Sequence, residues 1–245
     1  MKKIFMLLIF ILTGYMSFTE NYSTPLFIST ELVATVNDEI VRFFSFEKDS
    51  WKSDPSANLT LPVGCSDVSL TSVLGNIVVA TVDGNIVRFF SFEKDSWKSD
   101  PSANLTLPVG CSDVSLTSVL GNIVVATVDG NIVRFFSFEK DSWKSDPSVN
   151  LTLPVGCSDV SLTSVLGNIV VATVNENTVR FYSFEKGSWK SDPSANLTLP
   201  VGCTGISLTN VLGNIIVATV NKNSIQLYSF EKGFWKTDPS TIYHF

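Results

Sequence analysis

Short apolar and polar runs alternate along this chain, and the pattern returns every 46 residues. In one representative unit, residues 68–74 alternate apolar and polar side chains, and residues 77–82 form a β-branched run. Both patterns are typical of strands. The Asp-Gly-Asn sequence at 83–85 predicts a tight hairpin, because glycine and asparagine accept positive φ angles. Residues 86–92 form a third predicted strand, and Trp97 opens a short fourth one.

The middle strands of the unit are apolar on both faces. Ile77 and Val79 point to one side of the predicted sheet, whereas Val78, Ala80 and Val82 point to the other. A sheet with one face in water would alternate apolar and polar residues. Each sheet therefore needs a neighbour on both sides, as the blades of a β-propeller have. A β-solenoid is the alternative, although it usually has shorter periods.

Each repeat unit has one tryptophan at the same position, so the number of tryptophans gives the number of units. They are Trp51, Trp97, Trp143, Trp189 and Trp235. A period in the forties indicates a repeat architecture. We therefore predict an all-β fold, a five-bladed β-propeller of four-stranded antiparallel blades that forms a single domain over residues 20–245. The expected repeats are 20–65, 66–111, 112–157, 158–203 and 204–245.

The N-terminus has the pattern of a secretory signal peptide. Lys2 and Lys3 precede an apolar run over residues 4–12, and small residues at Ser17 and Thr19 suit a cleavage site. The alternative is a membrane anchor, but the run is shorter than the ~20 apolar residues that span a bilayer. We expect removal of residues 1–19, a secreted extracellular protein, and no membrane insertion after cleavage.

The charge of the chain argues against some classes of partner. Its formal net charge is −6, and it has no cluster of lysine and arginine. Binding to nucleic acid or to an anionic membrane relies on neutralising phosphates with such clusters. We therefore expect no nucleic-acid partner, and the overall charge argues against an anionic membrane as well.

Groups that would serve an enzyme are sparse in the sequence. The only histidine is His244, beside the C-terminus. No metal-binding spacing of cysteine and histidine occurs, and no phosphate-binding loop. A polar residue present in every repeat does not suit a unique catalytic position. We predict no catalytic residues, no metal and no cofactor.

The four cysteines recur at one position of the repeat: Cys65, Cys111, Cys157 and Cys203. Equivalent positions in sheets packed face to face lie roughly 10 Å apart, whereas a disulfide needs Cα atoms within about 7 Å. This comparison favours buried free thiols. Disulfides between blades remain the alternative.

An arginine recurs inside the apolar third strand and needs a partner there. The arginines are Arg42, Arg88, Arg134 and Arg180, and blade five has Gln226. Asp67, Asp113 and Asp159 are the candidate partners, within a blade or in the next one.

Asparagines followed by Leu-Thr or Tyr-Ser form acceptor sequences for N-glycosylation in a eukaryotic secretory pathway. The candidates are Asn21, Asn58, Asn104, Asn150 and Asn196.

The repeat resembles that of the β-propeller lectins. The segments that carry the likeness are residues 107–114, 121–126, 129–132 and 143–145. They resemble the tachylectin-2-like and tectonin-like groups and, more distantly, the fucose-binding propeller lectins. The resemblance implies five blades of about this length. Fucose-binding members have an arginine on the second strand where this chain has Val78 and Val79.

Each tryptophan lies close in sequence to an Asp-Pro pair. An indole ring and a carboxylate can together stack on and hydrogen-bond a sugar. The candidate carbohydrate-binding residues are the five tryptophans together with Asp54, Asp100, Asp146 and Asp192. We expect a multivalent lectin whose partners are glycans or glycoproteins. The alternative is a structural or surface protein in which the tryptophans only fill the gaps between blades. The oligomeric state is left open.

Overall fold

The computed structural model describes residues 24–29, 32–37, 39–47, 50–211, 213–221, 224–237 and 243–244. The expected signal peptide, residues 1–19, and the candidate Asn21 lie outside the described residues. Within the described part of the chain, no helix is long and apolar enough to cross a membrane.

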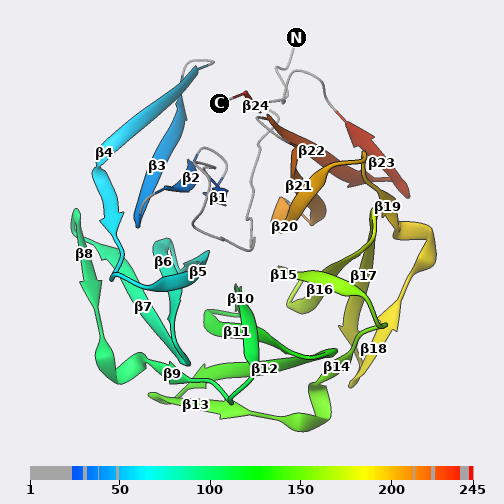
Figure 1. The fold of residues 1–245 in the computed structure, drawn as a ribbon, viewed down its shortest axis with the longest axis horizontal. Coiled ribbons are helices and arrows are strands. Elements are labelled where there is room, and N and C mark those ends of the chain that lie inside the picture. The colour runs from blue at the N-terminus through cyan, green and yellow to red at the C-terminus, as the bar shows by residue number, and fades with distance from the viewer. Residues whose placement is uncertain are drawn as a thin grey trace.

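The described strands form five antiparallel sheets, and in each sheet four consecutive strands pair in chain order. The sheets follow one another around a central axis, from the blue first sheet to the orange and red last one (Figure 1). This is an antiparallel β-propeller of four-stranded blades. The predicted all-β propeller is confirmed, and the solenoid alternative is wrong.

The first and second strands of each sheet lie nearest the axis in Figure 1. The first strands are β1 (Thr24–Ser29), β5 (Cys65–Val73), β10 (Cys111–Val119), β15 (Cys157–Val165) and β20 (Cys203–Val211). The second strands are β2 (Leu32–Asn37), β6 (Asn76–Asp83), β11 (Asn122–Asp129), β16 (Asn168–Asn175) and β21 (Asn214–Asn221). Successive first strands lie against one another, from β1 and β5 through to β15 and β20.

The third and fourth strands complete the blades towards the outside. The third strands are β3 (Ile40–Glu47), β7 (Ile86–Glu93), β12 (Ile132–Glu139), β17 (Thr178–Glu185) and β22 (Ser224–Glu231). The fourth strands are β4 (Ser50–Thr60), β8 (Ser96–Ser99), β13 (Ser142–Ser145), β18 (Ser188–Ser191) and β23 (Phe234–Thr237). The strand boundaries agree with the sequence pattern to within about three residues.

Two kinds of short element follow the fourth strand, and the sequence pattern did not indicate either. Three 3-10 turns start at the Asp-Pro pairs: η1 (Pro101–Ala103), η2 (Pro147–Val149) and η3 (Pro193–Ala195). Two-residue strands then pair back with the third strand of the same sheet. They are β9 (Leu105–Thr106), β14 (Leu151–Thr152), β19 (Leu197–Thr198) and β24 (Tyr243–His244). The segment that connects one blade to the next therefore pairs with the blade from which it comes.

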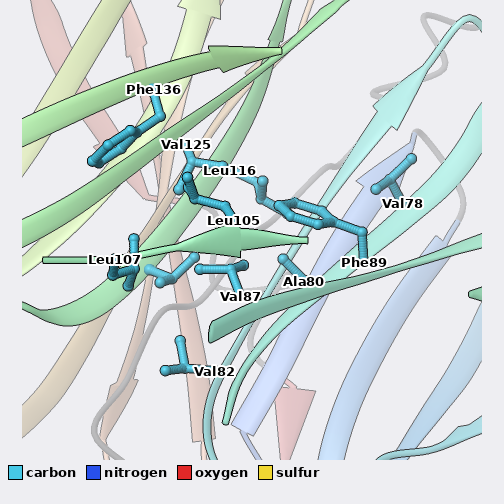
Figure 2. Packing of buried hydrophobic residues seen from close by; sticks show 11 residues of the cluster. Val78, Ala80, Val82, Val87, Phe89, Leu105, Leu107, Leu116, Val125 and Phe136 are labelled. Atoms are coloured by element: carbon cyan, nitrogen blue, oxygen red, sulfur yellow. The ribbon is translucent and has the colours of Figure 1, made fainter. Parts of the chain in front are cut away.

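The core consists of apolar layers between neighbouring blades. In one layer, Ala80 and Phe89 of the second sheet pack with Leu116, Val125 and Phe136 of the third sheet (Figure 2). Val79, which points to the other side of the same sheet, belongs to the layer shared with the first blade. The prediction of two buried faces per sheet is therefore confirmed.

Candidate functional site at the blade interfaces

The tryptophans lie where one blade meets the next. The side chains of Trp97, Trp143, Trp189 and Trp235 are described, whereas those of Trp51 and Asp54 lie outside the description. Each described tryptophan is the second residue of a fourth strand, β8, β13, β18 or β23, and each is partly exposed. The interface from blade two to blade three represents the others.

An aromatic cluster surrounds each indole. Trp143 pairs across the strands with Phe138 of its own blade, with ring centroids 5.1 Å apart and an angle of 56° between the planes. It also stacks on Phe89 of the preceding blade, at 5.1 Å and 26°. Such offset aromatic pairs contribute stability beyond the area they bury. The same arrangement recurs at Trp189 and Trp235.

The polar atom of each indole is bound within the protein. Trp143 donates its Nε1–H to the carbonyl oxygen of Ala103, the last residue of η1, at 2.6 Å. Trp97, Trp189 and Trp235 donate in the same way to the residue 40 positions earlier, at 2.7 Å. The indoles therefore hold adjacent blades together, as the packing alternative predicted. Only the exposed part of each indole ring remains available to contact a ligand.

The aspartates of the Asp-Pro pairs cap the 3-10 turns. Asp100 is exposed, and its Oδ1 accepts hydrogen bonds from the backbone N–H and the hydroxyl of Ser102, at 2.9 Å and 2.6 Å. The Ser102 hydroxyl and N–H hold the pKa of Asp100 below its usual value. Asp146 and Asp192 cap η2 and η3 in the same way.

The structure changes which tryptophan and aspartate belong together. Trp97 and Asp100 are close in sequence, but the turn that Asp100 caps receives the indole of Trp143, from the next blade. The candidate site is therefore composed of a capped turn from one blade and an indole from the following blade. Sequence proximity alone did not indicate this pairing.

The asparagines of the glycosylation sequences follow these turns directly. Asn104 closes η1 through its backbone N–H, which donates to the carbonyl oxygen of Pro101 at 3.3 Å. The Oδ1 atoms of Asn58, Asn104 and Asn150 are buried and have no hydrogen-bond partner. These asparagines thus lie beside the indole-binding carbonyl groups.

Two of the recurring arginines, Arg88 and Arg134, pair with other aspartates than the sequence suggested. Arg88 donates from Nε and from one terminal nitrogen to Asp83 Oδ2, at 3.1 Å and 2.6 Å. Arg134 and Asp129 form the same pair at 3.0 Å and 2.6 Å. For these two arginines the expectation that Asp67 and its equivalents are the partners is wrong. Arg88 lies opposite Thr81 on the adjacent strand, and Asp83 is only two residues further along that strand.

The buried aspartates have a different role, which the sequence did not reveal. Asp67 accepts a hydrogen bond from the N–H of Val68 at 2.8 Å and one from Val114, in the next blade, at 2.6 Å. Ser69 accepts the N–H of Leu116 at 3.0 Å. Burial raises the pKa of Asp67 well above its usual value.

The same connection recurs further along the ring. Asp159 accepts the N–H of Ile206 at 2.8 Å, and Ser161 accepts that of Leu208 at 2.9 Å. Burial raises the pKa of Asp113 to about 6. We call the aspartate and the serine together the inner clasp, because they join the first strands of adjacent blades.

All four cysteines are free thiols. Cys65 is buried, and the other three are partly buried. Burial raises the pKa of Cys65, Cys111 and Cys203. The four cysteines are free as predicted, but only Cys65 is buried as predicted.

No family model matches the chain, and no curated protein is similar to it in sequence. Solved structures are similar. A lectin from Aleuria aurantia in complex with Fucα1-6GlcNAc is 16% identical, with 88% of this chain and 77% of that chain covered and a TM-score of 0.59. Another structure of this fungal lectin, described as a six-bladed β-propeller, is 18% identical over 84% of this chain and 72% of that one, with a TM-score of 0.58.

The chain shares the propeller fold of these lectins. At this identity the likeness extends to the fold alone, and it confirms the expected resemblance to propeller lectins at that level. Enzymes have the fold as well. An exo-β-1,3-galactanase from Phanerochaete chrysosporium with β-1,3-galactotriose is 8% identical, with 97% of this chain and 68% of that chain covered and a TM-score of 0.60.

Proposed function

We propose that this protein is a secreted, non-catalytic lectin that binds carbohydrate at the interfaces between its blades. The observation that carries the proposal is the partly exposed indole repeated at four described interfaces, which at Trp143, Trp189 and Trp235 lies beside a capped turn of the preceding blade. Repetition on one rigid body favours multivalent binding, which raises avidity by roughly 10²- to 10⁴-fold without new contacts. Glycans and glycoproteins are the proposed partners.

The site binds a sugar through two groups. The indole N–H is occupied by the Ala103 carbonyl, so the exposed part of the Trp143 ring supplies an apolar surface for the sugar's C–H groups. Asp100 uses Oδ1 for both bonds to Ser102, which leaves Oδ2 to accept a sugar hydroxyl. The charge on Asp100 makes that hydrogen bond stronger than a neutral one.

The buried carboxylates support binding without catalysis. Glycoside hydrolases use two carboxyl groups that flank the bond they cleave. Asp67 and Asp159 instead hold backbone N–H groups of the neighbouring blade. Glu93 and its equivalents are exposed and paired with lysines. We therefore attribute the similarity to the galactanase to the shared fold.

The proposed ring has five blades, and blade five meets blade one at a seam. Pro25 occupies the position of Val114 in the first strand, because each pairs with the equivalent threonine of the second strand. A proline has no N–H to donate. The residue that would face it, at the Asp67 position of blade five, is Gly205. The N–H donor and the aspartate acceptor of the inner clasp are thus both replaced at this boundary, as expected if these two blades face each other. The Oγ atom of Ser207, at the Ser69 position of blade five, has no hydrogen-bond partner among the described residues.

Secretion and glycosylation complete the proposal. The N-terminal pattern supports cleavage after residue 19. In a eukaryotic host, Asn104 and its equivalents would then carry glycans at the rim where the turns lie. Mass spectrometry of the intact secreted protein would show both the new N-terminus and any glycan mass.

Retention on immobilised glycans tests the lectin proposal. We expect a glycan array to identify a ligand that retains the protein strongly, while the free monosaccharide competes only at high concentration. Retention should fall when the capping carboxylates are neutralised in the variant Asp100→Asn, Asp146→Asn and Asp192→Asn. Asparagine still caps a turn, so this variant keeps its fold. The matched control is Asp95→Asn with Asp141→Asn, in the turns between the third and fourth strands.

Two results would count against the proposal. If no glycan retains the folded protein, the structural alternative without a sugar site holds. If hydrolysis of a bound glycan is detected, the protein belongs with the glycosidases rather than with the lectins.

A further inference from the structure

One face of the propeller has exposed leucines in an unfavourable backbone conformation. Leu74, Leu120 and Leu166 lie in the hairpins between first and second strands, and they are 88%, 88% and 89% exposed. Their φ angles are 50°, 50° and 51°, in the left-handed region that bulky residues rarely adopt. Neither burial nor turn geometry within the chain accounts for leucine at these positions.

The three leucines form a connected apolar surface near the central axis. The Leu74 Cδ2 atom lies 3.6 Å from the position that a Cβ atom on Gly121 would occupy in the next hairpin. Leu120 reaches towards Gly167 in the same way, at 3.9 Å. We call this side of the disc the leucine face.

The turns between third and fourth strands lie on the leucine face too. In each blade, strand pairing places the hairpin after the first strand and the turn after the third strand at the same edge of the sheet. These outer turns carry exposed lysines: Lys94, Lys140, Lys186 and Lys232. The fifth blade adds Phe234, which is 73% exposed and stands where the three preceding repeats have Ser96, Ser142 and Ser188.

The charge of this face differs from that of the whole chain. The formal net charge of the chain is −6. In the outer turns of blades two to five, eight lysines stand against six carboxylates. The excess comes from blades four and five, where Gly187 and Gly233 replace Asp95 and Asp141. In these four blades the leucine face therefore has an excess of two positive charges (8 − 6), so the overall negative charge, which argued against an anionic membrane, does not describe this face.

We propose that the leucine face docks on the surface of an anionic lipid bilayer. Apolar side chains that project from a cationic surface insert between lipid headgroups while lysines attract the negative charge. The three leucines and Phe234 supply the apolar side chains. Lys186 and Lys232 supply positive charge in the two blades where a glycine replaces the aspartate of the turn. The contact is peripheral, with the disc lying flat on the membrane.

Vesicle sedimentation of the full secreted chain tests this inference independently of any sugar. We expect binding to glycan-free vesicles of phosphatidylcholine with phosphatidylserine, weaker binding to phosphatidylcholine alone, and weaker binding as salt rises. Replacing the leucines in the variant Leu74→Asn, Leu120→Asn and Leu166→Asn should lower vesicle affinity about tenfold or more through the lost apolar insertion. Asparagine suits the left-handed conformation, so the thermal midpoint of this variant should not fall.

The matched control replaces exposed valines at the opposite edge of the sheets. Val63→Asn, Val109→Asn and Val155→Asn together remove similar exposed apolar area and should leave vesicle binding unchanged. Phe234→Ser, which installs the residue of the other repeats, should weaken binding by a smaller factor than the leucine variant.

Three outcomes would overturn the proposal. One is a wild-type protein that remains in the supernatant with anionic vesicles. Another is equal loss of binding in the valine and leucine variants. The third is a dimer in sedimentation velocity that the leucine variant dissociates, because the leucine face would then contact a second copy of the chain.

Discussion

The indole N–H of Trp143 donates a hydrogen bond to the carbonyl oxygen of Ala103, in the preceding repeat, at 2.6 Å. This one bond joins the fourth strand of a blade to the turn that leaves the blade before it. Because the repeats are nearly identical in sequence, the same bond recurs around the ring. The tryptophan is therefore a structural residue first, and any ligand uses what the packing leaves exposed.

Replacing Trp143 with phenylalanine should destabilise the fold measurably. Phenylalanine keeps the stacking on Phe89, but the Ala103 carbonyl loses its donor, which costs about 1 kcal/mol. For a chain of this size, that cost lowers the thermal midpoint by roughly 2–4 °C. Calorimetry of the variant beside the wild type measures it. An unchanged midpoint would show that the bond contributes nothing to stability.

The inner clasp should show a graded response to substitution. Asp67→Ala leaves the N–H of Val114 without its acceptor at a buried site, which costs about 1–3 kcal/mol in free energy of unfolding. Asp67→Asn retains one acceptor oxygen and should cost less. Urea unfolding of both variants gives the comparison, and Asp95→Ala in an exposed turn is the control. Equal losses for the two Asp67 variants would contradict this role.

The raised pKa of Asp113, about 6, predicts a pH dependence of stability. The folded protein binds a proton at this site more tightly than the unfolded chain does. The contribution of Asp113 is therefore fully present below its ordinary value of 3.8 and is lost as the pH rises through about 6. Unfolding free energies at pH 4 and pH 7 should show a smaller decrease for Asp113→Asn than for the wild type. The same decrease in both proteins would assign the effect to other groups.

The proposed seam predicts an asymmetry between equivalent positions. Gly205→Asp restores the clasp residue in blade five, but Pro25 offers no N–H, so a carboxylate would be buried without its partner. We expect this variant to be less stable than Gly205→Ala, which tests the added bulk alone. The thermal midpoints of the two variants give this comparison of stability. If Gly205→Asp were the more stable protein, blade five would face a donor other than blade one.

Much of the fold follows from local pattern. The hairpin at Gly84 and the alternation around Leu70 depend on φ preferences and on the two-residue period of a strand, and both are visible in a few consecutive residues. The two apolar faces around Val79 indicated neighbours on both sides. The 3-10 turns were not predicted, because an Asp-Pro pair indicates only that a strand ends, and the cap forms only when the Asp100 carboxylate accepts the backbone N–H and the hydroxyl of Ser102.

Less of the candidate site could be predicted from local sequence pattern. The repetition of the tryptophans and the capping aspartates identifies them as candidates, but it does not show that the turn capped by Asp100 meets Trp143 of the next blade. A charge on an apolar strand needs a partner, and the sequence offered Asp67 and its equivalents, whereas Asp83, five residues before Arg88, supplies it. The leucine face could not be predicted, since a single leucine before a glycine is also the pattern of a strand end.

The sequence by itself determined the repeat, the order of strands within each blade and the positions of the hairpins, because these depend on neighbouring residues. The tertiary structure decided which groups of different blades meet: Trp143 with Ala103, and Asp67 with Val114. Those pairs are separated by 40 and 47 residues. They depend on how one sheet is offset against the next, and that offset is set by packing of side chains between blades, which no local pattern encodes.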